Sequence, residues 1–140
     1  DPTRIIDHAS GWHDRGVGDI NSFHIYFTPF VFPKFSKNDR RVTALTEFGG
    51  YSMSIDGHRF NTEKTFGYKI FKDKDKLSAA LRHLYLDRIK PLIHSKGLSA
   101  LVYTEVSDVE DETNGLLTFD REIVKVDIDF MREINEQIKL

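Results

Sequence analysis

Side chains able to act on a polar ligand fall at the ends of four short apolar runs in this sequence. Glu47 closes the run VTALTE and is followed by Phe48 and a pair of glycines. Carboxylates accept hydrogen bonds from hydroxyls or act on an anomeric carbon, and aromatic rings pack on the apolar faces of sugars. The combination therefore favours a carbohydrate site. The side chains concerned are His8, Trp12, His24, Tyr26, Glu47, Tyr103, Thr104 and Glu105.

Each of these residues also has an ordinary structural interpretation. A single carboxylate at the end of a strand commonly caps a helix or pairs with a surface lysine, and Tyr26 and Tyr103 could be core aromatics. Trp12, the only tryptophan, lies in a glycine-flanked loop where a large ring is partly exposed. The two glycines after Glu47 favour a functional role for it, because glycines permit a sharp turn and the close approach of a ligand.

The sequence predicts no metal site and no cofactor. Its six histidines show neither HExxH nor His-x-His spacing, and it has no cysteine to supply a thiolate. The acidic run over residues 108–112 does not match an EF-hand loop, which needs a glycine at its sixth position. We interpret this run as a loop at the rim of the site, from which Asp108 could reach a ligand hydroxyl. The alternative is a solvated acidic face.

The elements that would position these side chains are four strands and two helices. Strands are predicted over residues 4–9, 21–27, 42–47 and 98–104, because each run is short, apolar and followed by loop residues. Apolar residues at three- and four-residue spacing predict helices over about residues 74–95 and from residue 127 onward. Pro91 is expected to kink the first helix and Gly97 to cap it. The strand–helix–strand order over residues 42–104 is typical of a parallel α/β unit.

Length and composition are those of an ordinary globular domain. The 140 residues suffice for one domain, 39% are apolar, and a net charge of -2 gives no reason to expect nucleic acid or an anionic membrane as partner. No segment has the length of a membrane span, and no signal-peptide pattern is visible. The start at DPTR, without methionine, is expected of a piece of a longer protein, with a processed terminus as the alternative. The compartment stays open, with the cytoplasm or periplasm of a bacterium as the expected places.

Four blocks of the sequence together resemble a known family. The blocks DPTRIIDHASGW, GDINSFHIY, LTEFGG and LVYTEVSDVEDETNGLLTFDR occur in the order found in the C-terminal half of the catalytic barrel of glycoside hydrolase family 2. That family contains β-galactosidases, β-glucuronidases and β-mannosidases. The resemblance runs from residue 1 to about residue 125, and it implies that residues 1–140 form part of a (β/α)8 barrel. The chain would supply about the last four strands, with degenerate outer helices.

The resemblance also implies roles for individual residues. Members of the family are retaining β-glycosidases that use two carboxylates. Glu47 in LTEFGG matches the family's nucleophile, and Tyr26 matches a tyrosine that orients it. Tyr103 stands where many members carry a tryptophan that forms the floor of the sugar subsite. Trp12, His24, Glu105 and Asp108 complete the expected substrate contacts.

The resemblance leaves the second carboxylate unassigned. The family's acid/base is the glutamate of an Asn-Glu pair upstream of the DPTR block, and Asn135-Glu136 lies in the predicted terminal helix. We therefore expect the isolated chain to have little or no hydrolase activity. A non-catalytic carbohydrate-binding module is the alternative, and a structural domain in which Glu47 is only a cap is a further one. The exposed edges of half a barrel predict a homo-oligomer.

Overall fold

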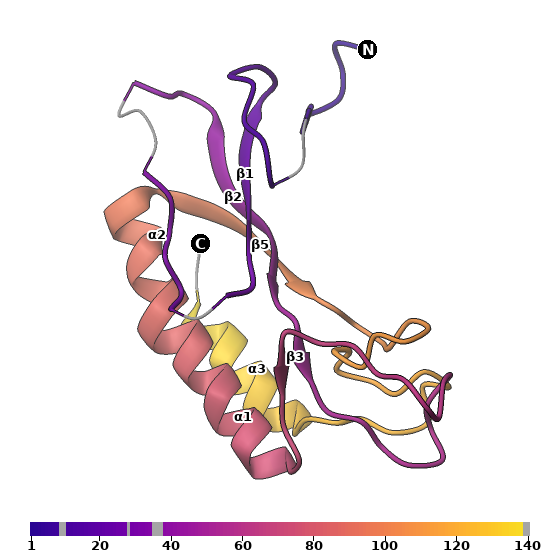
Figure 1. Ribbon diagram of the computed structural model, residues 1–140. Coiled ribbons are helices and arrows are strands. Elements are labelled where there is room, and N and C mark those ends of the chain that lie inside the picture. The colour runs from indigo at the N-terminus through magenta and orange to yellow at the C-terminus, as the bar shows by residue number, and fades with distance from the viewer. Residues whose placement is uncertain (9–10, 28, 35–37, 139–140) are drawn as a thin grey trace.

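A three-stranded parallel sheet forms the centre of the computed structural model, which describes residues 1–8, 11–27, 29–34 and 38–138. The strands are β1 (Ile20–Ile25), β2 (Val42–Gly49) and β5 (Leu98–Thr104), and β2 lies between the other two. Two short strands, β3 (Tyr51–Ser52) and β4 (Lys69–Ile70), pair separately in parallel. The loops over residues 53–68 and 105–126 gather beyond the C-terminal ends of the sheet (Figure 1).

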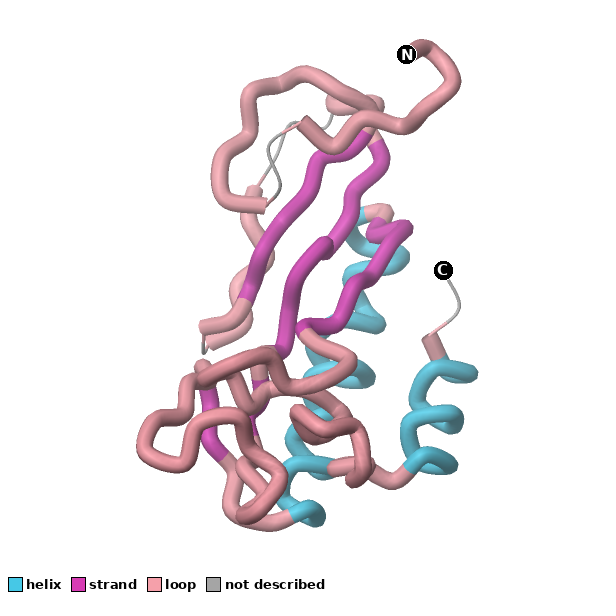
Figure 2. Tube along the Cα trace, turned by 90° about the vertical axis from the view of Figure 1, so that its right-hand side faces the viewer, coloured by secondary structure: helices cyan, strands magenta, loops and turns pink. Residues whose placement is uncertain are grey.

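One helical run crosses from β4 back to β5 and packs along one face of the sheet (Figure 2). It consists of α1 (Lys74–Arg82), a π-helical segment η1 (His83–Ile89) and α2 (Lys90–Lys96). Asp73 caps its start by accepting from the Lys76 amide, and Gly97, at φ 65°, ends it in the left-handed conformation, as expected. Pro91 lies in the first turn of α2, directly after the π-helical segment. The buried stripe of the run consists of Leu77, Leu81, Leu84, Tyr85 and Ile89.

The last helix, α3 (Ile128–Gln137), begins where the sequence predicts it. The Asp127 side chain accepts from the Phe130 amide at 2.9 Å, and Met131 and Ile134 are buried against the remaining core. No helix within the described parts of the chain is long and apolar enough to cross a membrane.

A shift in strand register sets the direction of the side chains at the end of β2. Phe23 pairs with Leu45 but His24 pairs with Glu47, and on the other side Leu45 pairs with Leu101 but Phe48 with Tyr103. Strand β2 thus carries one extra residue at Thr46–Glu47, as in a β-bulge. Strict alternation would turn Glu47 toward the helices and Phe48 away from them. The extra residue instead keeps Phe48 fully buried and leaves Glu47 on the opposite face.

The expected partial (β/α)8 barrel of four strands with outer helices is wrong. Residues 4–8 form no strand, and Ile5 and Ile6 are exposed. Scattered hydrogen bonds join this N-terminal segment to β1, such as those from the Ile20 amide to Ile6 and from the Ser22 hydroxyl to Asp7. Since Ile5 and Ile6 stay exposed to solvent in the described part of the chain, the apolar side chains of the segment gain little burial from forming a strand. No described residues form a helix between β1 and β2.

The expectation of a homo-oligomer stays a prediction, and its basis changes with the fold. The edges of the sheet are now β1 and β5 rather than the ends of half a barrel. Backbone bonds from the N-terminal segment occupy part of the β1 edge. Val102 on β5 is exposed. Strand β5 is therefore the edge through which self-association would proceed.

Candidate functional site

Glu47 lies near the C-terminal end of the central strand, β2. It contacts two side chains: His24 of β1 and Tyr26, the residue that follows β1. The Tyr26 hydroxyl donates to Glu47 Oε2 at 2.6 Å. His24 Nδ1 lies 3.1 Å from the same oxygen, and its side chain is only 5% exposed. The Glu47 side chain is 43% exposed. One carboxylate oxygen is thus held by the protein while the group stays open to solvent, the arrangement expected of a carboxylate that meets a ligand.

The hydroxyl of Tyr26 is held so that its proton points at Glu47. Thr104, the last residue of β5, places its Oγ1 3.1 Å from the Tyr26 hydroxyl oxygen. A phenol has one proton, so Tyr26 can donate to Glu47 while it accepts from Thr104. Burial and the neighbouring Glu47 carboxylate raise the pKa of Tyr26 well above its usual range. Tyr26 therefore stays protonated, and remains a hydrogen-bond donor, around neutral pH.

Aromatic rings surround this carboxylate. Trp12 is 54% exposed, and its ring lies 5.5 Å from His24 edge-on and 6.4 Å from Tyr26 nearly parallel to it. Tyr68, in the loop before β4, stacks on Tyr26 at 4.0 Å with an angle of 8° between the rings. Phe27 meets Tyr68 edge-on. The result is a row of rings in which the exposed Trp12, Tyr68 and Phe27 flank the buried Tyr26 next to a carboxylate, which suits the apolar face of a sugar.

The two glycines after Glu47 make room for aromatic rings on both faces of the sheet. Gly50 has φ +59°, and a Cβ there would lie 2.5 Å from Tyr68 and 2.9 Å from Tyr26. Gly49 has φ +93°, and a Cβ there would lie 2.3 Å from Tyr103. The sequence interpretation of this pair, space for a ligand, is thus changed: the rings of Tyr26 and Tyr68 fill the space at Gly50, and the core ring of Tyr103 fills the space at Gly49.

Tyr103 lies on the opposite face of the sheet from Glu47. It pairs in register with the buried Phe48, meets that ring edge-on at 5.5 Å, and lies near Tyr85 of the helical run. Its ring is therefore part of the core and does not join the Glu47 cluster. The residue of β5 on the side of Glu47 is Thr104, which contacts Tyr26.

Asp108 is also placed away from the ligand-facing side. It is buried, and its Oδ1 accepts from Lys125 Nζ at 2.5 Å and from the Gly115 amide at 2.8 Å. Lys125, equally buried, also donates to the carbonyl oxygens of Met53 and Thr113, both at 2.9 Å. The ion pair joins two parts of the loop after β5, and the bond from Lys125 to the Met53 carbonyl fixes that loop to the chain after β3. It leaves Asp108 no exposed atom for a ligand.

Glu105 is partly buried beside other acidic groups. Its Oε1 is buried and has no hydrogen-bond partner among the described residues. Burial, and after it the carboxylates of Glu112 and Asp108, raise the pKa of Glu105 to about 7, although Lys125 acts in the other direction. Glu105 is therefore a carboxyl group that titrates near neutral pH, next to the residue that holds Tyr26.

The raised pKa of Glu105 predicts a pH dependence of stability. The folded pKa of about 7 lies above the ordinary value of 4.5, so the folded state binds the proton more tightly than the unfolded state. The stabilisation is complete below about pH 4.5 and is lost as the pH rises through 7. Glu105→Gln should therefore match the wild type in urea unfolding at low pH and exceed it in stability at pH 8. Glu133→Gln, at an exposed position, is the control. An effect of Glu105→Gln on stability that is constant with pH would contradict the raised pKa of Glu105.

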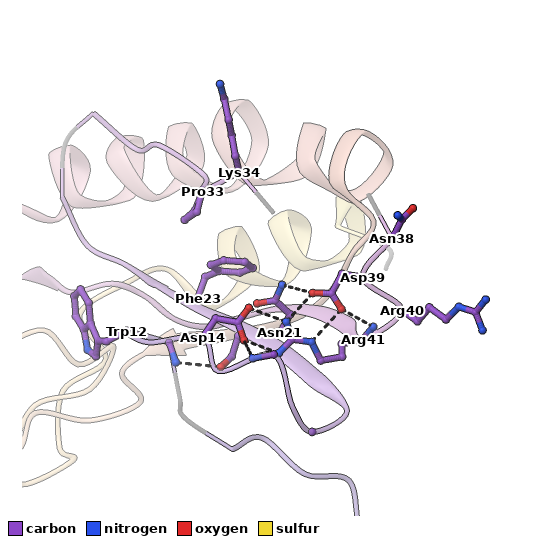
Figure 3. A pocket seen from close by; sticks show the side chains of 14 residues that line it. Trp12, Asp14, Asn21, Phe23, Pro33, Lys34, Asn38, Asp39, Arg40 and Arg41 are labelled. Carbon is purple, nitrogen blue, oxygen red and sulfur yellow. Dashed lines mark hydrogen bonds and ion pairs between the residues drawn. The ribbon is translucent and has the colours of Figure 1, made fainter. Parts of the chain in front are cut away.

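A cavity of about 760 Å³ lies toward the other end of the strands, between β1 and the loops that precede β1 and β2 (Figure 3). Arg41, at its inner end, binds Asp14 with both terminal nitrogens at 2.7 Å and also pairs with Asp39 at 2.7 Å. Arg41 holds the pKa of both carboxyls below the usual range. These charges satisfy one another, and Asn21 donates to Asp39. The polar groups of this cavity mostly hold loops together, so we place the chemistry at Glu47.

Of the residues selected from the sequence, the structure brings together Trp12, His24, Tyr26 and Glu47. Thr104 joins them as a strand-end residue that had no assigned role. His8 instead accepts from the Arg15 amide within its own loop. Tyr68 was missed; its only signal is an aromatic residue next to Gly67 in a loop, and the stacking on Tyr26 depends on the tertiary fold.

The search against protein-family models found no match for this chain, and the search of curated proteins found none either.

Proposed function

We propose that the cluster around Glu47 is a glycoside-binding site and that Glu47 is the nucleophile of a retaining β-glycosidase, as the resemblance to glycoside hydrolase family 2 implies. The observation that carries this proposal is the hydrogen bond from Tyr26 to Glu47 Oε2 at 2.6 Å. It fixes one oxygen of a partly exposed carboxylate and leaves the other to attack.

The proposed chemistry follows from the positions of the side chains. Glu47 Oε1 attacks the anomeric carbon, the bond to the leaving oxygen breaks, and a glycosyl ester forms. Tyr26 and His24 hold the carboxylate in one orientation. Trp12 offers the exposed ring on which the apolar face of the sugar packs.

The second carboxylate of a retaining site belongs about 5 Å from the first. Within the described ranges, the contacts of Glu47 are with Tyr26 and His24, and none is with another acid. We therefore propose that the acid/base is supplied by a longer protein of which this chain is a part. The 140-residue chain should accordingly turn over substrates with poor leaving groups slowly or not at all.

A non-catalytic carbohydrate-binding module is the second candidate. The exposed ring of Trp12 beside a single carboxylate favours it, because stacking and hydrogen bonding suffice for binding. The two candidates share sugar binding and differ in whether Glu47 forms a covalent bond.

Sugar binding itself can be followed through the only tryptophan. Titration with phenyl β-galactoside, β-glucoside, β-mannoside or β-glucuronide should give a saturable change in Trp12 fluorescence for at least one of them. Glu47→Gln should weaken that binding about tenfold, the equivalent of a hydrogen bond to a charged group. Glu133→Gln is the matched control and should bind as the wild type does. No fluorescence change with any of the four sugars, in a chain shown to be folded, would contradict both candidates.

A further inference from the structure

A second group of possible ligand atoms lies in the loops beyond the sheet, separate from the Glu47 cluster. His58 Nδ1 is 2.7 Å from Asp120 Oδ2 and 4.0 Å from Glu122 Oε2. The three ligand atoms lie within 4.8 Å of one another. An imidazole nitrogen and two carboxylate oxygens thus converge from two loops that are 62 residues apart in the sequence.

The two loops are tight turns that hold these side chains in place. His58 closes a turn through the bond from its amide to the Ile55 carbonyl, and Gly57 supplies the positive φ of +83°. On the other turn, Asp120 Oδ1 accepts from the Thr118 hydroxyl at 2.6 Å and from the Glu122 amide at 3.1 Å. These bonds occupy Oδ1 and direct Oδ2 toward His58.

We propose that His58, Asp120 and Glu122 bind a divalent cation of the Zn²⁺ class. One nitrogen and two carboxylate oxygens form a donor set that Zn²⁺ uses, whereas Mg²⁺ and Ca²⁺ prefer oxygen ligands throughout. Three protein ligands leave a fourth position for water. The His58 side chain is one-quarter exposed and that of Glu122 is 73% exposed, so the ion can enter from solvent and Glu122 can adjust to it.

The chain contains a matched pair without the third ligand. His83 Nδ1 lies 2.8 Å from Asp87 Oδ2, at a spacing of four residues on the helical run. The distance and the atom types are those of the His58–Asp120 pair. What differs is the second carboxylate, since Glu122 joins the first pair and the His83 pair contacts Arg88 instead. The third ligand, Glu122, distinguishes the proposed site from the His83 pair.

The test is direct measurement of Zn²⁺ binding to the untagged 140-residue chain by isothermal titration calorimetry at pH 7.5. The expected result is one ion per chain. Each of His58→Gln, Asp120→Asn and Glu122→Gln should weaken the affinity about tenfold or more, and His83→Gln should leave it unchanged. Co²⁺ should give visible absorption bands that disappear in His58→Gln.

Other outcomes overturn the proposal. These are the absence of saturable Zn²⁺ binding, equal affinity in the wild type and His58→Gln, and loss of binding in His83→Gln. Because the Glu122 side chain is largely exposed, Glu122→Gln does not threaten folding, and it keeps the test decisive if His58→Gln is unstable. None of these measurements depends on whether Glu47 binds a sugar.

Discussion

Replacing Lys125 with methionine should destabilise the protein by ~3–5 kcal/mol, because it leaves the buried Asp108 carboxylate without its partner. The ammonium of Lys125 is fully buried and donates to Asp108 and to the carbonyls of Met53 and Thr113. Burial raises the pKa of Asp108 and lowers that of Lys125, while their contact opposes both shifts. Without the contact, only the cost of burying the charge remains. Since a domain of this size is stable by about 5–15 kcal/mol, such a loss is a large share of the total.

Urea unfolding followed by circular dichroism measures this effect. Asp108→Asn combined with Lys125→Met should recover part of the loss, because no unpaired charge then stays buried. Lys76→Met is the matched control: Lys76 pairs with Asp73 on the surface, and that pair should contribute at most ~1 kcal/mol. A Lys125→Met variant within ~1 kcal/mol of the wild type would show that the buried pair does not hold the loop.

Local patterns in the sequence were sufficient for the helices and for three of the strands. The apolar spacing and the glycine at position 97 each act over a few residues, and the structure has the helices and the end of the first helical run where predicted. The remaining strand prediction, over residues 4–9, was wrong, because the described residues 4–8 form no strand. An apolar run becomes a strand only if neighbouring elements bury it, and nothing local to the run reveals whether such neighbours exist.

The sequence was sufficient to predict the residues of the candidate site that lie at strand ends. It was not sufficient where strand register, or a contact between distant segments, determines the position of a side chain. Glu47 and Tyr26 meet because the ends of adjacent parallel strands lie together. The bulge in β2 cannot be seen in the sequence, and it decides that Phe48 faces the core while Glu47 lies on the opposite face with Tyr26. For Asp108, the partner Lys125 lies 17 residues away, and an acidic run gives no sign of a buried lysine.

The largest functional effect is expected at Glu47. A 2-deoxy-2-fluoro-β-glycosyl fluoride carries a leaving group that departs without protonation, so a site with a nucleophile but no acid can still form the glycosyl ester. The fluorine at carbon 2 slows the hydrolysis of that ester. Glu47→Gln should abolish the reaction, because the amide cannot act as the nucleophile. Tyr26→Phe should slow it about tenfold to a hundredfold, as expected for loss of ~1.5–3 kcal/mol from a hydrogen bond to a charged group.

One variant separates this effect from general damage to the protein. Glu133→Gln removes an exposed carboxyl group on α3 and should react as the wild type does. The same chain should hydrolyse methyl β-glycosides with little or no turnover.

The most direct test is mass spectrometry of the chain after incubation with the galactosyl, glucosyl, mannosyl and glucuronyl forms of this reagent. The predicted result is one added sugar per chain with at least one form, mapped by peptide sequencing to Glu47 and absent from Glu47→Gln. Saturable sugar binding at Trp12 without any covalent adduct would instead assign the chain to the binding modules. An adduct that persists in Glu47→Gln, or that maps to another residue, would contradict the assignment of Glu47 as the nucleophile.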